Sequence, residues 1–108
     1  MYFNMKKLMI GRIIAEAFDV PYYTLSEDMR ARDYVEARHF AMWFLSRREH
    51  MGKSRIARKF KHHHATVIHA IKTVDDLLQT DKGFIYKSNK ALKALEEAGI
   101  IEHEMEEV

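Results

Sequence analysis

Apolar residues recur at the spacing of an α-helix along nearly all of this 108-residue chain. Side chains that repeat about every 3.6 positions share one face of a helix, whereas strands alternate apolar and polar residues. Only four Gly and one Pro interrupt the pattern. The spacing predicts long helices over residues 4–18, 33–49, 63–80 and 85–98, and a short helix over 53–60. We therefore predict an all-α fold of five to six helices.

The few helix-breaking residues predict where these helices end. Pro21 disfavours helical backbone at the residue before it, so the following segment "YYTLS" is expected to form at most a short helical turn. Gly52 is expected to stop the helix over 33–49, and Gly99 to stop the last helix. Residues 99–108 hold four acids and no Lys or Arg. We therefore predict one domain over residues 1–98 and a flexible acidic tail over 99–108.

The formal net charge of +2 conceals an uneven distribution of charge. Residues 96–108 hold six acids and no Lys or Arg, which leaves residues 1–95 with 18 basic and 10 acidic side chains, a balance of +8. Residues 47–61 alone hold seven Lys or Arg and a single acid, Glu49. Clustered positive charge is typical of proteins that bind a polyanion, although a solvated helix face has the same composition.

Several classes of function are excluded by what the sequence lacks. Cysteine is absent, which excludes disulfides and thiolate metal sites. No apolar run reaches the roughly 18 residues that a membrane span needs, so we expect no membrane partner. The pattern GxxxxGK[ST] does not occur, so we expect no nucleotide to bind through a P-loop.

A helix-turn-helix motif is predicted by the short basic segment 53–60, the turn at Lys61–His62 and the longer segment 63–80. In that motif the first turn of the second helix lies against base edges in the major groove of DNA. The predicted base-contacting residues are His62, His63, His64, Ala65 and Thr66. The residues predicted to hold phosphates beside them are Lys53, Ser54, Arg55 and Lys61.

The three consecutive histidines from His62 to His64 raise two other possibilities. A metal site on a helix needs ligands three or four residues apart, but the spacings from His62 to His69 are one, one and five, and the neighbours are cationic. Acid–base catalysis needs a partner carboxylate or nucleophile, and the local sequence offers none. We therefore expect no metal, no cofactor and no enzymatic activity. Partly buried packing is the alternative interpretation of His64 and His69.

The runs "RHFAM" at 38–42, "RIARKF" at 55–60 and "HHATVIH" at 63–69 resemble the C-terminal DNA-binding domain of the bacterial replication initiator DnaA. That family carries Asp-His-Thr-Thr-Val, an aliphatic residue and His at its recognition helix, and Arg-Gln-x-Ala-Met upstream. The resemblance extends over about residues 7–95. It implies an all-α, Trp-repressor-like fold with a central helix-turn-helix, and binding of double-stranded DNA in both grooves.

The resemblance also implies roles for particular residues. Arg30 matches an arginine that the family places in the minor groove, and Arg38 matches a second arginine near the start of the following helix. His69 matches a histidine near the DNA backbone. The positions that match base contacts are His63, His64, Ala65 and Thr66. We include Arg32, from the same loop as Arg30, among the predicted DNA-binding residues.

Three departures from the family pattern bear on which DNA sequence is read. His63 stands where the family has Asp, and a carboxylate accepts from cytosine whereas imidazole would not do so in the same way. Ala65 replaces a Thr, which keeps a methyl group but loses the hydroxyl. The turn at Lys61–His62 is one residue shorter and lacks the family's Gly-Gly-Arg. Duplex binding is therefore expected to carry over better than the family's usual target sequence.

These observations predict a sequence-specific, double-stranded DNA-binding module, cytoplasmic and nucleoid-associated, that acts in replication or in transcription regulation. The initiator's ATPase domain has no counterpart, so we expect a free-standing relative or a piece of a longer protein. The alternative is a protein-interaction domain that kept the helix-turn-helix fold but not DNA binding. A monomer and a homodimer both remain compatible with the sequence.

Overall fold

The computed structural model describes the backbone of residues 2–101 and the side chains of residues 8–101. Its elements are α1 (Tyr2–Ala17), the 3-10 helix η1 (Tyr22–Ser26), α2 (Arg32–Arg47), α3 (Lys53–Phe60), α4 (His64–Thr80) and α5 (Lys82–Glu97). No strand occurs within residues 2–101, so the predicted all-α class is confirmed. In this range no helix combines the length and the apolar character that crossing a membrane requires.

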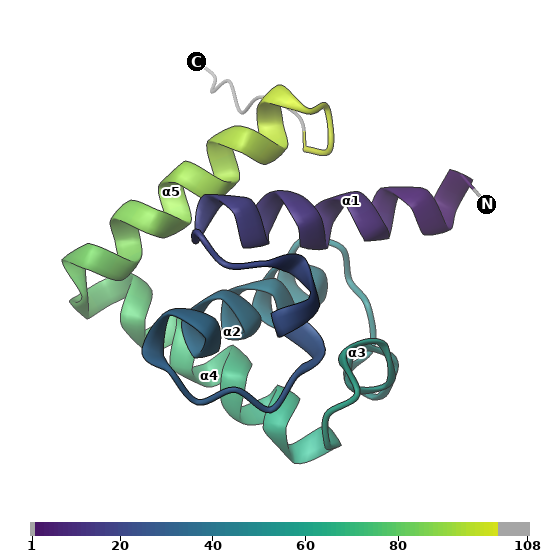
Figure 1. Cartoon of the computed structure of the whole chain (residues 1–108), viewed down its shortest axis with the longest axis horizontal. Coiled ribbons are helices and arrows are strands. Elements are labelled where there is room, and N and C mark those ends of the chain that lie inside the picture. The colour runs from purple at the N-terminus through teal and green to yellow at the C-terminus, as the bar shows by residue number, and fades with distance from the viewer. Residues whose placement is uncertain (1, 102–108) are drawn as a thin grey trace.

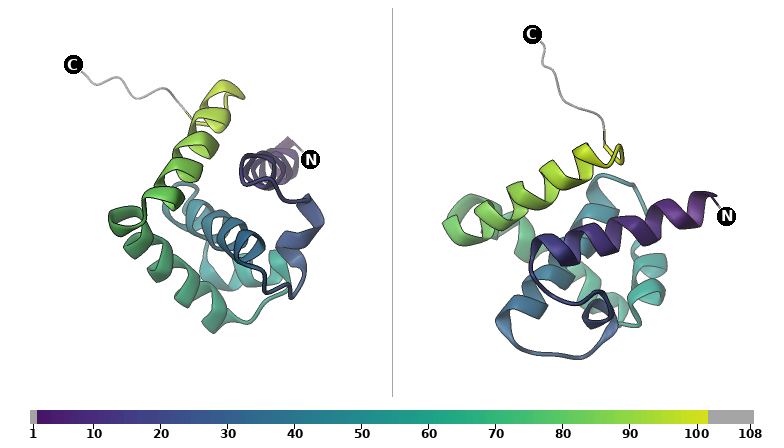
Figure 2. Two further views of the ribbon diagram at one scale, coloured as in Figure 1. Left: turned by 60° about the vertical axis from the view of Figure 1, so that its left-hand side comes forward. Right: turned by 45° about the horizontal axis from the view of Figure 1, so that its top comes forward.

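Helix α2 lies at the centre of the molecule (Figure 1). It packs against α1, α3 and α4, while α5 packs against α1 and α4 (Figure 2). Helix α3 lies beside α2 and the first turns of α4 lie below it, whereas α1 and the later turns of α5 lie above it (Figure 1). The helix-turn-helix therefore occupies one end of the molecule, away from the C-terminal end of α5.

Three phenylalanines join the helices above α2 to its centre. The ring of Phe40 in α2 lies 5.4 Å from that of Phe18, which follows α1, and 6.2 Å from that of Phe84 in α5. Phe18 and Phe84 are 5.9 Å apart, and all three side chains are fully buried. Burying each such side chain contributes about 1.5–3 kcal/mol. This cluster fixes α5 and the end of α1 on α2.

Helix α2 ends earlier than the sequence predicts. Its last residue is Arg47, and Gly52 is the N-cap of α3 rather than the stop of α2. The chain turns at His50, which has left-handed backbone (φ 57°), and the N–H of Met51 donates to the carbonyl oxygen of Leu45 at 2.9 Å. This turn buries the Met51 side chain, which a continued helix would not do.

Helix α5 begins at Lys82, three residues before the predicted start. The carboxylate of Asp81 accepts a hydrogen bond from the N–H of Phe84 at 2.9 Å, which satisfies a free donor of the first turn. Gly99 ends the helix region as predicted, with φ 79°, and the N–H of Ile100 then donates to the carbonyl oxygen of Leu95.

The predicted acidic tail over 99–108 lies mostly outside the described residues. Within the described part, Ile100 and Ile101 are half-buried and pack against the core. They therefore associate with the folded domain that the sequence predicts over residues 1–98. Residues 102–108 lie outside the described range.

The turn between α3 and α4 forms where the sequence predicts it. Lys61 has left-handed backbone (φ 58°, ψ 44°), and the N–H of His62 donates to the carbonyl oxygen of Ala57 at 2.9 Å. Helix α4 then begins at His64, one residue later than predicted, with His63 as its N-cap. Left-handed backbone is strained for a residue with a β-carbon, so Lys61 holds this turn at some cost in stability.

Candidate nucleic-acid interface

The first turn of α4 is exposed to solvent. The Nδ1 atom of His63 accepts a hydrogen bond from the N–H of Ala65 at 3.0 Å and so caps the helix. Because Nδ1 accepts, the proton of the neutral ring is on Nε2, where it can be donated to a group outside the protein. His64 and Ala65 are exposed, and Thr66 is half-buried. This turn therefore presents ring nitrogens, a methyl group and a hydroxyl to a partner.

Helix α3 brings positive charge beside that turn. It packs against α4 through a buried face, and its remaining side chains carry the charge. The exposed residues are Lys53, Ser54, Arg55 and Arg58, followed by Lys61 in the turn. Gly52 caps the helix without a side-chain hydrogen bond, which leaves the first N–H groups of α3 uncapped by a side chain. A helix N-terminus flanked by Lys and Arg attracts anions.

Arg38 holds the loop between η1 and α2, residues 27–31. Its Nη1 atom donates to the carbonyl oxygens of Glu27 at 3.2 Å and Met29 at 3.3 Å. The side chain is 7% exposed, and this burial lowers the pKa of the guanidinium. The predicted place of Arg38 on a DNA-contacting surface therefore needs correction, because its guanidinium is inside the loop. Arg30, by contrast, is exposed on the same loop.

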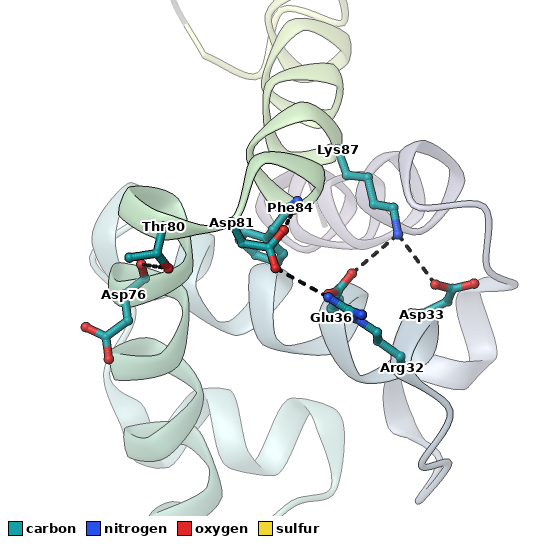
Figure 3. Close-up of polar contacts among 8 residues, drawn as sticks. All are labelled: Arg32, Asp33, Glu36, Asp76, Thr80, Asp81, Phe84 and Lys87. Carbon is teal, nitrogen blue, oxygen red and sulfur yellow. Dashed lines mark hydrogen bonds and ion pairs between the residues drawn. The ribbon is translucent and has the colours of Figure 1, made fainter.

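Arg32 also lies in surroundings that differ from the prediction. Its guanidinium forms ion pairs with Glu36 at 3.1 Å and with Asp81 at 3.3 Å (Figure 3). Lys87 extends the network to Glu36 at 3.3 Å and to Asp33 at 3.4 Å. This network joins the starts of α2 and α5, on the opposite side of the molecule from α3 (Figure 1). Arg32 therefore belongs to a cluster of paired charges and not to the surface around the first turn of α4.

Two histidines near α4 have little or only partial exposure to solvent. His39 of α2 is 9% exposed, and its ring meets that of His69 edge to face at 6.0 Å. Burial lowers the pKa of His39 to about 4. His62 is half-buried, and burial lowers its pKa too, together with the positive charge of Arg38. His62 therefore departs from its predicted place among the base-contacting residues, because its ring turns toward η1.

The exposure of His64 and His69 contradicts the interpretation of these two residues as packing residues. The Nε2 atom of His69 lies 3.3 Å from the hydroxyl oxygen of Thr73, one turn further along α4. Within residues 8–101, no three side chains of the metal-binding types are grouped closely enough to hold an ion. The exposed histidines are thus available as hydrogen-bonding groups on the outer face of α4.

Asp75 fixes α4 against α2. The Nε1 atom of Trp43 donates to one carboxylate oxygen at 2.9 Å, and the guanidinium of Arg47 pairs with the other. Partial burial raises the pKa of Asp75, but the hydrogen bonds from Arg47 and Trp43 outweigh that effect and lower it. A charged carboxylate therefore joins the two helices, and helical spacing could not predict this contact because it links residues about 30 positions apart.

The predicted site did not include Ile68, which is 45% exposed on α4. Its place in the helical repeat distinguishes it from the core residues Val67, Ile71 and Val74, so the spacing alone could have drawn attention to it. Ile68 follows Ala65 by three positions and His64 by four, which places all three on one face of the helix.

Comparison with known proteins identifies the family. The family described as bacterial dnaA protein helix-turn-helix matches residues 8–74. The chain is 33% identical over 94 residues to the chromosomal replication initiator protein DnaA of a Wolbachia from Brugia malayi, which covers 83% of this chain and 20% of the relative. It is 37% identical over 76 residues to the same protein of Flavobacterium psychrophilum, which covers 69% of this chain and 16% of the relative.

This chain spans a fifth or less of the length of these relatives. The part that matches the family contains α2, α3 and the first two thirds of α4. Because the match extends over more than half of the chain, the chain belongs to the bacterial DnaA helix-turn-helix family.

Proposed function

We propose that this chain is a double-stranded DNA-binding module that reads sequence through the first turn of α4. The observation that carries the proposal is the exposure of His63, His64 and Ala65 directly beside the exposed cations of α3. A protein that recognises a DNA sequence needs groups that reach base edges and groups that hold phosphates in register. Both kinds of group gather at this end of the molecule.

Phosphate binding is assigned to α3 and the turn that follows it. Lys53 and Arg55 flank the N-terminal end of α3, where Ser54 adds a hydroxyl, and Lys61 lies at the other end of the helix. Each phosphate that these cations neutralise releases counterions, so the affinity should fall steeply as salt rises. The contacts fix the position of α4 in the groove but carry no sequence information.

Base reading is assigned to the residues at the start of α4. His63 has its Nε2–H directed away from its capping bond, and it can donate to the O6 or N7 acceptor of guanine or the O4 acceptor of thymine. His64 is exposed one position later, and the Thr66 hydroxyl can donate or accept. His69, on the same exposed side of α4, is assigned to the DNA backbone.

Arg30 is assigned to the minor groove. Arg30 is exposed on a loop whose path is fixed by Arg38. In this proposal Arg30 contacts the DNA and Arg38 positions the loop. A narrow minor groove has enhanced negative potential, which attracts an inserted guanidinium.

The relatives are named as chromosomal replication initiators, and only the helix-turn-helix part is shared with them. For this chain we propose duplex binding in the control of replication or transcription, without ATP hydrolysis. Neither a cofactor nor a metal ion has a role in the proposal. The mass of the protein–DNA complex decides between one chain and two chains per binding site.

Selection of bound sequences from a random duplex library, at about physiological salt, tests the proposal. The wild-type chain is expected to enrich a defined motif, and both His64→Ala and Arg30→Ala are expected to lose part of it. Lys93→Ala is the matched control, because this exposed cation lies on α5 away from α3. Equal enrichment by all four proteins, or enrichment of no sequence at all, contradicts the proposal.

A protein-interaction role is the second candidate. Leu8 and Met9 of α1 are 39% and 43% exposed. Exposed apolar side chains grouped in this way are typical of surfaces that bind another protein. This candidate gains support if the random library yields no motif and the double variant Leu8→Ala/Met9→Ala abolishes binding of a protein partner.

A further inference from the structure

Ile68 is the only large hydrophobic side chain that α3 or α4 exposes. Its neighbours on the outer face of α4 are His64, Ala65 and Lys72, which are all exposed. These residues are three or four positions away from Ile68 and border it on the helix surface, while the fourth such neighbour, Ile71, is buried. An apolar surface therefore lies within the face that the proposed function directs at DNA.

The shape of this surface follows from helix geometry. Helical side chains point back toward the N-terminus, so Ile68 covers the turn that contains His64 and Ala65. Ala65 has no atoms beyond its β-carbon and leaves Ile68 accessible. The two side chains form a continuous apolar surface that begins at the first turn of α4. Two branched methyl groups and the alanine methyl make up its contact area.

We propose that Ile68 and Ala65 bind the 5-methyl group of a pyrimidine in the major groove, which makes Ile68 a specificity-determining residue. The inference rests on the proposed function. The C5-methyl of thymine is the one apolar group that the major-groove edge of a natural base pair presents. 5-Methylcytosine presents the same group in the same position, so both bases are candidate ligands.

The alternative contacts are less favourable for this surface. Ala65 has no hydroxyl and Ile68 has no polar atom, so a donor or acceptor on a base pressed against them would lose its hydrogen bond to water without replacement. A methyl group suffers no such loss and removes apolar area from water on both sides. Lys72, one turn beyond Ile68, is placed to hold a phosphate while the methyl contact forms.

Uracil substitution tests the inference, because it removes the thymine methyl and leaves the base-pairing atoms unchanged. In a duplex that the chain binds, each thymine is replaced in turn by uracil and the dissociation constant is measured. We expect one or two positions at which the wild-type chain binds about four-fold more weakly, the change expected for one buried methyl group. At those positions Ile68→Ala, which keeps Ala65, should lose most of the preference for thymine over uracil.

Met9→Ala is the matched control, because Met9 is exposed to a similar extent on α1, and it should keep the wild-type preference for thymine. A second arm places cytosine or 5-methylcytosine at the sensitive position. If the duplex with 5-methylcytosine binds more tightly than the duplex with cytosine, the surface recognises the methyl group of either base. If the two bind equally, the surface recognises thymine alone.

Two results overturn the inference while the proposed function stands. One is an affinity that no uracil substitution changes, and the other is an undiminished thymine preference in Ile68→Ala. A wild-type chain that binds no duplex at about physiological salt overturns both the proposed function and this inference.

Discussion

The molecule carries positive charge at two of its edges, and the two edges differ in how far their cations are paired with carboxylates. At the edge where α2 meets α5, Arg32 and Lys87 are bound by Asp33, Glu36 and Asp81. At the edge formed by α3 and the first turn of α4, four cations form no ion pair with a carboxylate of residues 8–101; they are Lys53, Arg55, Arg58 and Lys61.

From this difference we expect the pairing of cations with carboxylates to decide which of the two surfaces can bind a polyanion. A cation already held by carboxylates has its charge neutralised locally and must give up these contacts before it can bind a phosphate. In the part of the chain that the structure describes, Lys53, Arg55, Arg58 and Lys61 have no such contacts to give up. We refer to these four cations as the unpaired edge, and to Arg32 and Lys87 with their carboxylate partners as the paired edge.

Removing cations from each edge gives the largest expected contrast. Lys53→Ala/Arg55→Ala should weaken duplex binding by about ten- to a hundred-fold and lower the slope of log affinity against log salt by about two. Arg32→Ala/Lys87→Ala removes the same formal charge from the paired edge and should change the affinity by about two-fold at most. Titrations of one duplex at several salt concentrations measure both quantities. Equal losses from the two edges would show that the pairing has no influence on DNA binding.

Acid should destabilise the fold through His39, which is buried against His69 on the side of the molecule that holds the helix-turn-helix. The folded-state pKa of His39 is about 4, whereas an imidazole in an unfolded chain has a pKa of about 6.5. The stability contributed by neutral His39 is therefore complete above about pH 6.5 and is lost as the pH falls toward 4. Between about pH 7.5 and pH 5 the loss should be about 2 kcal/mol of unfolding free energy.

Denaturant unfolding at the two pH values measures this loss. His39→Gln, which cannot titrate, should remove most of the pH dependence, while His64→Ala removes an exposed histidine and should leave it unchanged. An unfolding free energy of the wild-type chain that stays constant over this range would contradict the effect of burial on His39.

The smallest expected effect concerns Lys61, where two variants distinguish the role of its charge from that of its strained backbone. Lys61→Gly should raise the free energy of unfolding by about 0.5–1 kcal/mol, because glycine adopts left-handed backbone without strain. Lys61→Ala keeps the β-carbon and should leave stability nearly unchanged. If Lys61 binds a phosphate, both variants should weaken DNA binding equally. A loss of affinity in only one of them would assign the effect to the shape of the turn instead of the charge.

Most of the fold could be predicted from the sequence, because apolar spacing and the few helix-breaking residues are local signals. The short helix over 53–60, the turn at Lys61 and the stop at Gly99 are confirmed. The start of α5 was predicted late because Asp81 acts through one capping bond, which apolar spacing does not reveal. The early end of α2 depends on the burial of Met51, which is a tertiary effect.

The candidate site was harder to predict, since it depends on contacts between distant residues. Arg32 and Asp81 lie 49 positions apart, and Arg38 is separated by about ten positions from the loop carbonyls that it binds. A matching position in a family motif indicates where a residue lies along the chain, but not whether its side chain faces solvent. For that reason Arg38 was predicted on the surface although it is buried. His62 was predicted there from its place in the helix-turn-helix, which likewise does not show which way the ring faces.

Arg38 binds helix α2 to the loop that carries Arg30. Further along α2, Trp43 and Arg47 bind it to Asp75 of α4. The separation between the two proposed DNA-reading elements is therefore fixed before any duplex arrives. A duplex can therefore bind both elements only if the distance between its neighbouring major and minor grooves matches the distance between the Arg30 loop and the first turn of α4. In the proposed complex, a double helix of A-form shape would not bind, whatever its base sequence, because its deep major groove and shallow minor groove cannot receive both elements together.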